Sequence, residues 1–106
     1  MSAHNTLVAI RDLLSDPARW TKGTAARDDH DRAVNTHAPQ AVCWCITGAL
    51  ERLCDDGDAG MFANDAIFRA ANSLYLCGPI AVNDNIGHAA VLAVLDRAIV
   101  ETAVPQ

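Results

Sequence analysis

Apolar residues recur at helical spacing in four segments of this chain, whereas its strand signals are short. These segments predict one helix that begins at Asn5 or Thr6 and ends before Asp16-Pro17, and further helices over residues 39–54, 61–74 and 86–102. Short connections join the four segments. We therefore expect a mainly α fold, a compact bundle of about four helices in a single domain over residues 1–106.

Caps and apolar faces set the bounds of these helices. Pro39 suits the first turn of the second helix, and Asn64 or Asp65 offers a later start for the third. Asp84 or Asn85 caps the last helix, after a break at Gly78-Pro79 and a short extended connector over residues 80–82. Asp55-Asp56-Gly57-Asp58 ends the second helix with a turn. The residues expected to face the core are Leu7, Ile10, Leu13 and Leu14, then Val42, Ile46, Ala49, Leu50 and Leu53, then Phe62, Ile67, Phe68, Ala71 and Leu74, and finally Val91, Leu92, Leu95, Ala98 and Ile99.

A polar stretch without helical periodicity covers residues 20–39. Within it, Asp28-Asp29-His30-Asp31 is typical of a turn, because Asp side chains hydrogen-bond to nearby backbone. The flanking segments 24–27 and 32–34 predict a small β-hairpin, which would make the fold α+β; an ordered loop is the alternative.

The charge balance argues against nucleic-acid binding. Eight Lys and Arg stand against 13 Asp and Glu, a formal net charge of −5, whereas nucleic-acid binders draw their affinity from basic residues that neutralise phosphates. No apolar run approaches the roughly 18 residues that span a bilayer. We therefore expect a cytoplasmic protein that engages neither nucleic acid nor membrane.

Four cysteines and four histidines raise the question of a zinc site. On a helix, Cys43 and Cys45 point about 200° apart, so they cannot share one ion. We expect no metal, no cofactor and no essential disulfide, with Cys45 and Cys77 as buried free thiols.

Cys43 is the best candidate nucleophile, because it falls near the start of the second predicted helix, where the helix dipole favours a thiolate. A base is also required, and His37 and His88 are the candidates. Nothing in the sequence places either histidine beside Cys43. His4 and His30 fall near a terminus and in a turn, where solvation explains them.

The segment Asn83-Asp84-Asn85 precedes the last helix and holds more polar groups than one cap needs. It is either an Asx turn with an N-cap, or a corner in which these side chains, backbone N–H groups and His88 bind an anion or a small ligand. As a recognition corner, it would lose binding but not stability when Asn83 or His88 becomes alanine. Trp44 is expected in the core and Trp20 beneath the hairpin; either could wall a cleft at this corner.

Several motifs together carry a resemblance to a known family. They are Trp44-Cys45, Gly48-Ala49-Leu50, Asn83-Asp84, Gly87, Val91-Leu92 and Asp96-Arg97-Ala98-Ile99. With them the chain resembles, over most of its length, a family of short bacterial and phage proteins called domain of unknown function 6197. The resemblance implies a small accessory protein and brings no established activity.

The sequence holds no phosphate loop, metal quartet, paired-carboxylate spacing or nucleophile motif. We therefore expect a non-enzymatic protein-interaction or small-ligand-binding module, acting as a monomer or homodimer on a protein partner or a small ligand. The alternative is a small hydrolase or transferase that uses Cys43 or His88 with Asp84. The candidate ligand-binding residues are Asn83, Asp84, Asn85, His88, Trp20 and Trp44. Convergence of Asp84, His88 and a tryptophan on one concavity would favour the enzyme.

Overall fold

The computed structural model describes residues 2–54 and 57–103, and most of them are helical. In chain order the elements are α1 (Ala3–Leu14), the 3-10 turn η1 (Pro17–Arg19), β1 (Ala26–Arg27), β2 (Cys43–Trp44), α2 (Ile46–Leu53), α3 (Gly57–Tyr75), α4 (Pro79–Ala81), the π turn η2 (Val82–Ile86) and α5 (His88–Thr102). The predicted mainly α fold with one small antiparallel strand pair is thus confirmed. No helix of the described chain is long and apolar enough to cross a bilayer.

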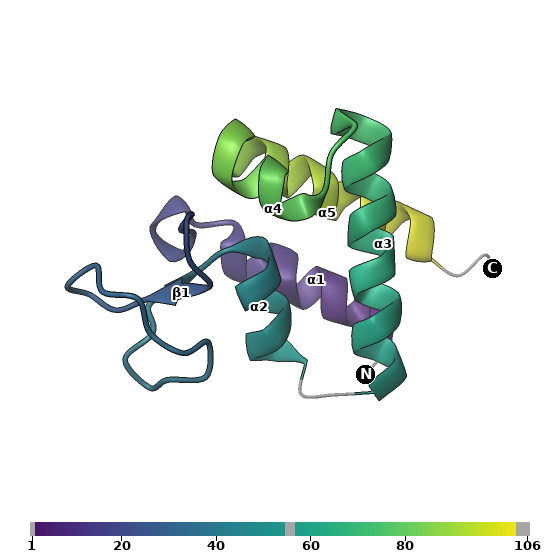
Figure 1. The fold of residues 1–106 in the computed structure, drawn as a ribbon. Helices are drawn as coiled ribbons and strands as arrows, with labels where there is room; N and C mark the ends of the chain where they lie inside the picture. The colour runs from purple at the N-terminus through teal and green to yellow at the C-terminus, as the bar shows by residue number, and fades with distance from the viewer. Residues whose placement is uncertain (1, 55–56, 104–106) are drawn as a thin grey trace.

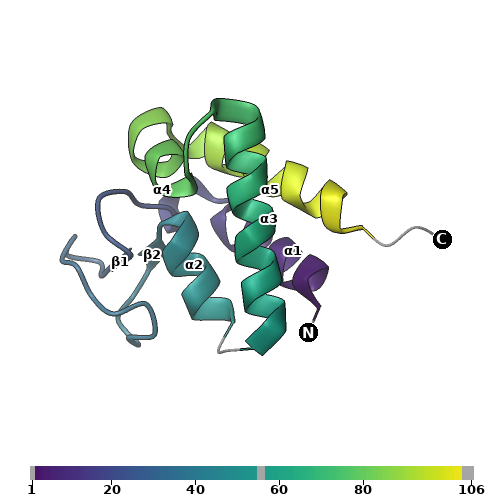
Figure 2. The same cartoon turned by 45° about the vertical axis from the view of Figure 1, so that its right-hand side comes forward.

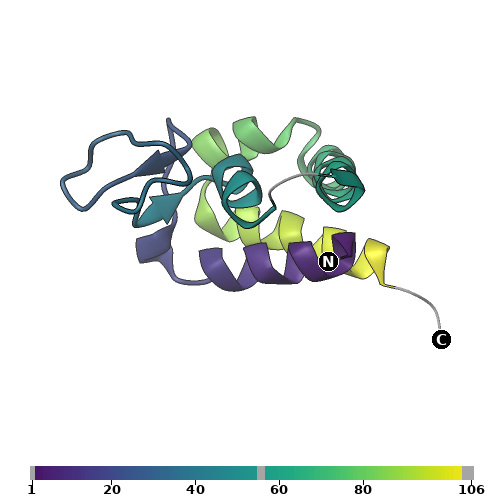
Figure 3. The same cartoon turned by 90° about the horizontal axis from the view of Figure 1, so that it is seen from below.

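Three helices enclose the core. α1 and α5 lie side by side and run in opposite directions, and α3 crosses them (Figures 1 and 3). The face that α3 turns inward is built from small residues, which let its backbone approach its neighbours closely. The fully or almost fully buried side chains of these helices are Leu7, Ile10 and Leu14, then Ala63, Ala66, Ile67, Ala70 and Ala71, and then Ala90, Val91, Val94, Leu95 and Ala98.

The first helix begins earlier than predicted. Ser2 is its cap, with its hydroxyl oxygen 3.1 Å from the Asn5 backbone N–H that donates to it. Asn5 and Thr6 therefore lie inside α1, so both predicted caps are wrong. The end of the helix is as expected, because Asp16 precedes a proline and caps the following 3-10 turn.

The second helix is shorter than predicted, because the chain before Ile46 is extended. Cys43 pairs with Arg27 and Trp44 pairs with Ala26 in an antiparallel ladder. The adjoining Val42 N–H donates to the Arg27 carbonyl oxygen at 2.9 Å. Residues 42–45 are thus held by backbone hydrogen bonds to a distant segment, and the helix predicted over residues 39–45 is wrong.

The predicted hairpin forms only in part. Its turn is present: the Asp28 N–H donates to the Arg32 carbonyl at 2.9 Å, and the Val34 N–H donates to Ala26 at 3.0 Å. A single bridge joins Arg27 to the returning segment. The strand partner of β1 is β2.

The third helix starts at Gly57 rather than at Met61, so neither Asn64 nor Asp65 is its cap. Three residues predicted to face inward are exposed: Phe62 to 60%, Phe68 to 48% and Leu74 to 39%. The alanine face is buried in their place. Of the predicted turn, residues 55–56 lie outside the described residues, and Gly57 and Asp58 belong to α3.

The segment before the last helix is helical, not extended as predicted. Pro79 opens the short helix α4, which continues into the π turn η2. α4 and η2 sit over the N-terminal end of α2 (Figure 2). α5 starts at His88, directly after Gly87, which has φ 125°. Asp84 and Asn85 lie within η2, and no side chain caps α5, so the predicted caps and the start at Ile86 are wrong.

Candidate functional site

The polar corner predicted at residues 83–88 is a π turn. The Gly87 N–H donates to the Val82 carbonyl at 3.0 Å, five residues back. Such turns are rare and frequently lie at functional sites. The turn places Asn83 inward, Asp84 at the edge of a pocket, and Asn85 in solvent.

Asn83 is 1% exposed and uses its whole amide within the protein. Its Oδ1 accepts from Trp20 Nε1 at 2.8 Å and from the Ile46 N–H at 3.0 Å. Its Nδ2 donates to the Thr21 carbonyl oxygen and to Asp84 Oδ1, both at 3.0 Å. Asn83 therefore ties η2 to the start of α2 and to the segment after η1.

Asp84 is partly exposed, and both of its hydrogen bonds reach one oxygen. Oδ1 accepts from the Gly23 N–H at 3.1 Å and from Asn83 Nδ2. Among the described residues no hydrogen bond reaches Oδ2. One acceptor of this carboxylate is therefore available to another molecule.

His88 faces away from this pocket. Its Nε2 lies 2.6 Å from the carbonyl oxygen of Leu14, at the end of α1. Because a carbonyl oxygen only accepts, Nε2 carries the proton and donates it. The imidazole also packs against the indole of Trp20, with ring centroids 5.4 Å apart. His88 thus joins the start of α5 to the end of α1.

Trp44 is 6% exposed, as expected for a core residue. Its Nε1 donates to the Thr36 carbonyl at 3.0 Å, and the Arg52 guanidinium lies 5.3 Å from the centre of its ring. Trp20 is bound through Asn83 and His88, and it pairs with Trp44 through the backbone. Both indole N–H groups have partners inside the protein.

A pocket of about 220 Å³ lies beside the π turn. We call it the Asp84 pocket. It is lined by Gly23, Thr24, Ala25, Cys45, Thr47, Ile80, Asn83 and Asp84. Of the predicted site residues, this lining unites Asn83 with Asp84; it does not include Cys43, Asn85, His88, Trp20 or Trp44.

The sequence analysis missed six of the eight lining residues, among them Cys45 and Thr47. Cys45 is the N-cap of α2, and its Sγ accepts from the Gly48 N–H at 3.2 Å. The hydroxyl oxygen of Thr47 is buried and has no hydrogen-bond partner among the described residues. A buried hydroxyl without a partner costs free energy. No signal in the sequence marked either residue, because the helix predicted over residues 39–54 placed both of them inside it.

The thiols differ from expectation. Cys43, predicted near a helix start, lies in β2, with its Sγ 3.9 Å from the Arg27 carbonyl oxygen. Cys43, Cys45 and Cys77 form no disulfide, and all four cysteines are only partly buried, Cys45 and Cys77 included. His37 is exposed.

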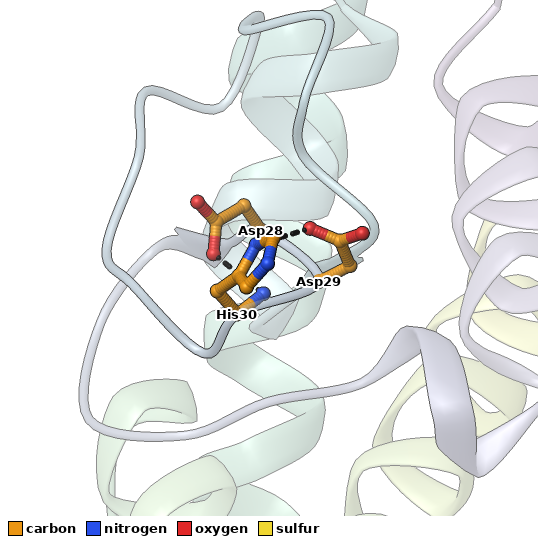
Figure 4. Close-up of side chains that lie close together, drawn as sticks. All are labelled: Asp28, Asp29 and His30. Carbon is orange, nitrogen blue, oxygen red and sulfur yellow. Dashed lines mark hydrogen bonds and ion pairs between the residues drawn. The ribbon is translucent and has the colours of Figure 1, made fainter.

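Three potential metal ligands gather in the turn after β1. Asp28, Asp29 and His30 hold ligand-type atoms within 4.8 Å of one another (Figure 4). Both oxygens of Asp28 already accept hydrogen bonds, from the His30 and Arg32 N–H groups and from the Arg32 side chain. The Arg32 N–H is the foremost cause that holds the pKa of Asp28 below its ordinary value, and the His30 N–H and the Arg32 guanidinium add to it against the opposing effect of burial. These contacts explain Asp28 as the organiser of the turn.

The fold and the pocket define a class: a small helical domain with one short strand pair and a ligand-sized hollow at a π turn. Within that class, the chain belongs to the family of unknown function DUF6197, whose model matches residues 1–101. The family resemblance expected from the sequence is therefore confirmed. No curated protein and no solved structure matches the chain.

Proposed function

We propose that this protein is a non-enzymatic module that binds a small polar ligand in the Asp84 pocket. The observation that carries the proposal is the buried Thr47 hydroxyl oxygen without a partner, at the wall of a pocket that also holds Asp84. Oδ2 of Asp84 accepts hydrogen bonds, and the Thr47 hydroxyl can both accept and donate one. They favour a ligand that presents N–H groups, such as an amine or a primary amide, with a small apolar part against Ile80 and Ala25.

The proposal favours binding over catalysis because of what faces the pocket. A thiol nucleophile needs a base beside it. The Cys45 sulfur already caps α2, and the described lining contains no histidine. Cys43 and His88, the residues of the alternative hydrolase or transferase, bind backbone carbonyls elsewhere. A bacterial or phage accessory role and a cytoplasmic location remain predictions from the sequence.

The binding test is an NMR titration of the ¹⁵N-labelled protein with a panel of small primary amines and primary amides. We expect shifts confined to the amides of residues 23–25, 45–47 and 83–84. Thr47→Val keeps the shape of the side chain but removes the oxygen, and we expect it to weaken binding about tenfold. Asp84→Asn should weaken amines more than amides, and the exposed Asn85→Ala is the matched control.

Stability provides a second readout for the same variant. Because Thr47→Val removes a buried hydroxyl that has no partner, it should raise the free energy of unfolding by about 1 kcal/mol. A Thr47→Val variant that is more stable than the unmodified protein and binds the ligand more weakly supports the proposal. Loss of stability in Thr47→Val, or a panel that perturbs no pocket amide, contradicts it.

A further inference from the structure

The outer side of α3 exposes several large apolar side chains to solvent. Met61 is 68% exposed, Phe62 60% and Phe68 48%, although the opposite side of the helix is buried against α1 and α5. At about 100° per residue these three side chains fall on one stripe with three polar residues. We call this stripe the α3 outer face; it consists of Met61, Phe62, Asp65, Phe68, Arg69 and Asn72.

The α3 outer face carries one charge of each sign. Asp65 and Arg69 form an ion pair one helical turn apart, and their side chains are 58% and 59% exposed. Both charges therefore remain accessible for pairing with a second molecule. Two exposed phenyl rings, those of Phe62 and Phe68, lie on the same face as these charges.

A hollow of about 340 Å³ lies at the C-terminal end of the same face. It is lined by Phe68, Arg69, Asn72, Cys77 and Gly78. Apolar cavities of roughly 150 Å³ take up a benzene ring, so the hollow has room for a phenyl group.

These features are complementary to themselves under a two-fold rotation. When two α3 helices lie antiparallel with the axis at the level of Ile67, the midpoint between the two charges, Asp65 of each copy lies opposite Arg69 of the other. In the same arrangement Phe62 of each copy lies opposite Asn72 of the other, at the mouth of the hollow. Every contact then occurs twice, as an isologous interface requires.

We propose that the α3 outer face joins two copies of this chain into an antiparallel two-fold dimer. Phe62 enters the hollow of the second copy, and two Asp65–Arg69 pairs across the axis fix the register. The Asp84 pocket takes no part in this contact, so ligand binding and self-association fail independently.

Sedimentation analysis over a wide range of protein concentration tests the proposal. We expect the mass to rise with concentration to twice the 11.3 kDa of the chain. Asp65→Arg and Arg69→Asp each place like charges opposite one another, so each should shift association to higher concentration by at least tenfold. The double variant with both substitutions restores the pairs and should associate like the unmodified protein.

Phe62→Asp should abolish association while the circular dichroism spectrum stays unchanged, because Phe62 is exposed. Val42→Asp is the matched control: Val42 is 44% exposed and directly precedes β2, which lies on the far side of α2 from α3 (Figure 2). It should leave association unaltered. A protein that stays monomeric throughout, or a dimer whose association is indifferent to the single charge reversals, overturns the proposal.

Discussion

The buried side chain of Asn83 holds separate segments of the chain together through hydrogen bonds. Its amide accepts two hydrogen bonds and donates two, and it thereby joins η2 to the segment after η1 and to the start of α2. Since a buried polar group is costly when it loses its partner, each of those partners depends on the amide.

Asn83→Ala should therefore destabilise the protein. We expect the free energy of unfolding to fall by roughly 2–4 kcal/mol, because the Trp20 indole N–H and the Ile46 N–H lose their acceptor. Urea unfolding measures the change. Asn85→Ala, at the exposed neighbour, should stay within about 0.5 kcal/mol of the unmodified protein. Equal stability of the two variants would show that the amide does not hold the three segments.

Asp28 makes the stability of the turn after β1 depend on pH. Hydrogen bonds from Arg32 and His30 stabilise its carboxylate form in the folded state and lower its pKa. A carboxyl group whose pKa is lowered in the folded state stabilises the fold at pH values above its ordinary pKa. This contribution is lost as the pH falls through the pKa of the folded state.

The stability difference between the unmodified protein and Asp28→Asn should therefore be largest near neutral pH. It should shrink as the pH falls below about 4, where aspartate ordinarily protonates. Thermal unfolding over a pH series measures it, with Asp29→Asn, at an exposed neighbour, as the control. A difference that grows on acidification would contradict the assignment.

At the scale of single residues, the sequence singled out two residues that line the Asp84 pocket. The surplus of polar groups at Asn83 and Asp84 falls on the π turn η2, because such residues favour non-helical hydrogen bonding. Their partners could not be predicted. The contact of Asn83 with Trp20 spans 63 residues, and the approach of Thr47 to the pocket depends on how α2 packs.

At the scale of elements, the helix α2 packs directly on extended backbone. Gly48 lies in its first turn, and a Cβ there would fall 2.0 Å from the carbonyl oxygen of Ala25. That oxygen also accepts from the Cys45 N–H at 3.1 Å. The close approach sets the position of α2 and one wall of the Asp84 pocket.

Gly48→Ala should consequently destabilise the protein by about 3 kcal/mol, because the overlap is with backbone that cannot rotate away. This loss outweighs the gain of about 1 kcal/mol that alanine brings to a helix. Gly60→Ala in α3 is the comparison, since its Cβ would meet the end of the Cys54 side chain. Urea unfolding should find the second variant near the unmodified protein; similar losses in both would refute the explanation.

Local periodicity predicted which segments are helical better than where they begin or which side they bury. The start of the second helix was misplaced because Cys43 and Trp44 pair with residues 16 and 18 positions earlier, a contact that no local pattern records. In α3 the apolar stripe containing Phe68 was taken for the core. The alanine stripe is buried instead, because only small side chains permit its close packing on α1 and α5.

At the scale of the whole molecule, stability is concentrated in α1, α3 and α5. These helices hold most of the large buried side chains, whereas the segment between β1 and β2 is largely exposed. Regions with few buried contacts open at lower free energy than the core.

Hydrogen exchange followed by NMR should reproduce this division. We expect the slowest amides in the middle turns of α1, α3 and α5, and faster exchange over residues 29–40. Thr36 lies in that segment but is buried. It is an internal comparison, because the burial of one residue should not slow the hydrogen exchange of the neighbouring amides. Slowest exchange in β1 and β2 would place the stable unit elsewhere.

The antiparallel pairing of α1 and α5 brings the two ends of the helical body together. His4 Nδ1 lies 3.2 Å from the Thr102 hydroxyl, across 98 residues of sequence (Figure 3). The order of the elements along the chain is therefore separable from their arrangement in space. A circular permutant, with a short linker across the former ends and new ends between the exposed residues Pro39 and Gln40, would retain every helix pair and the pocket.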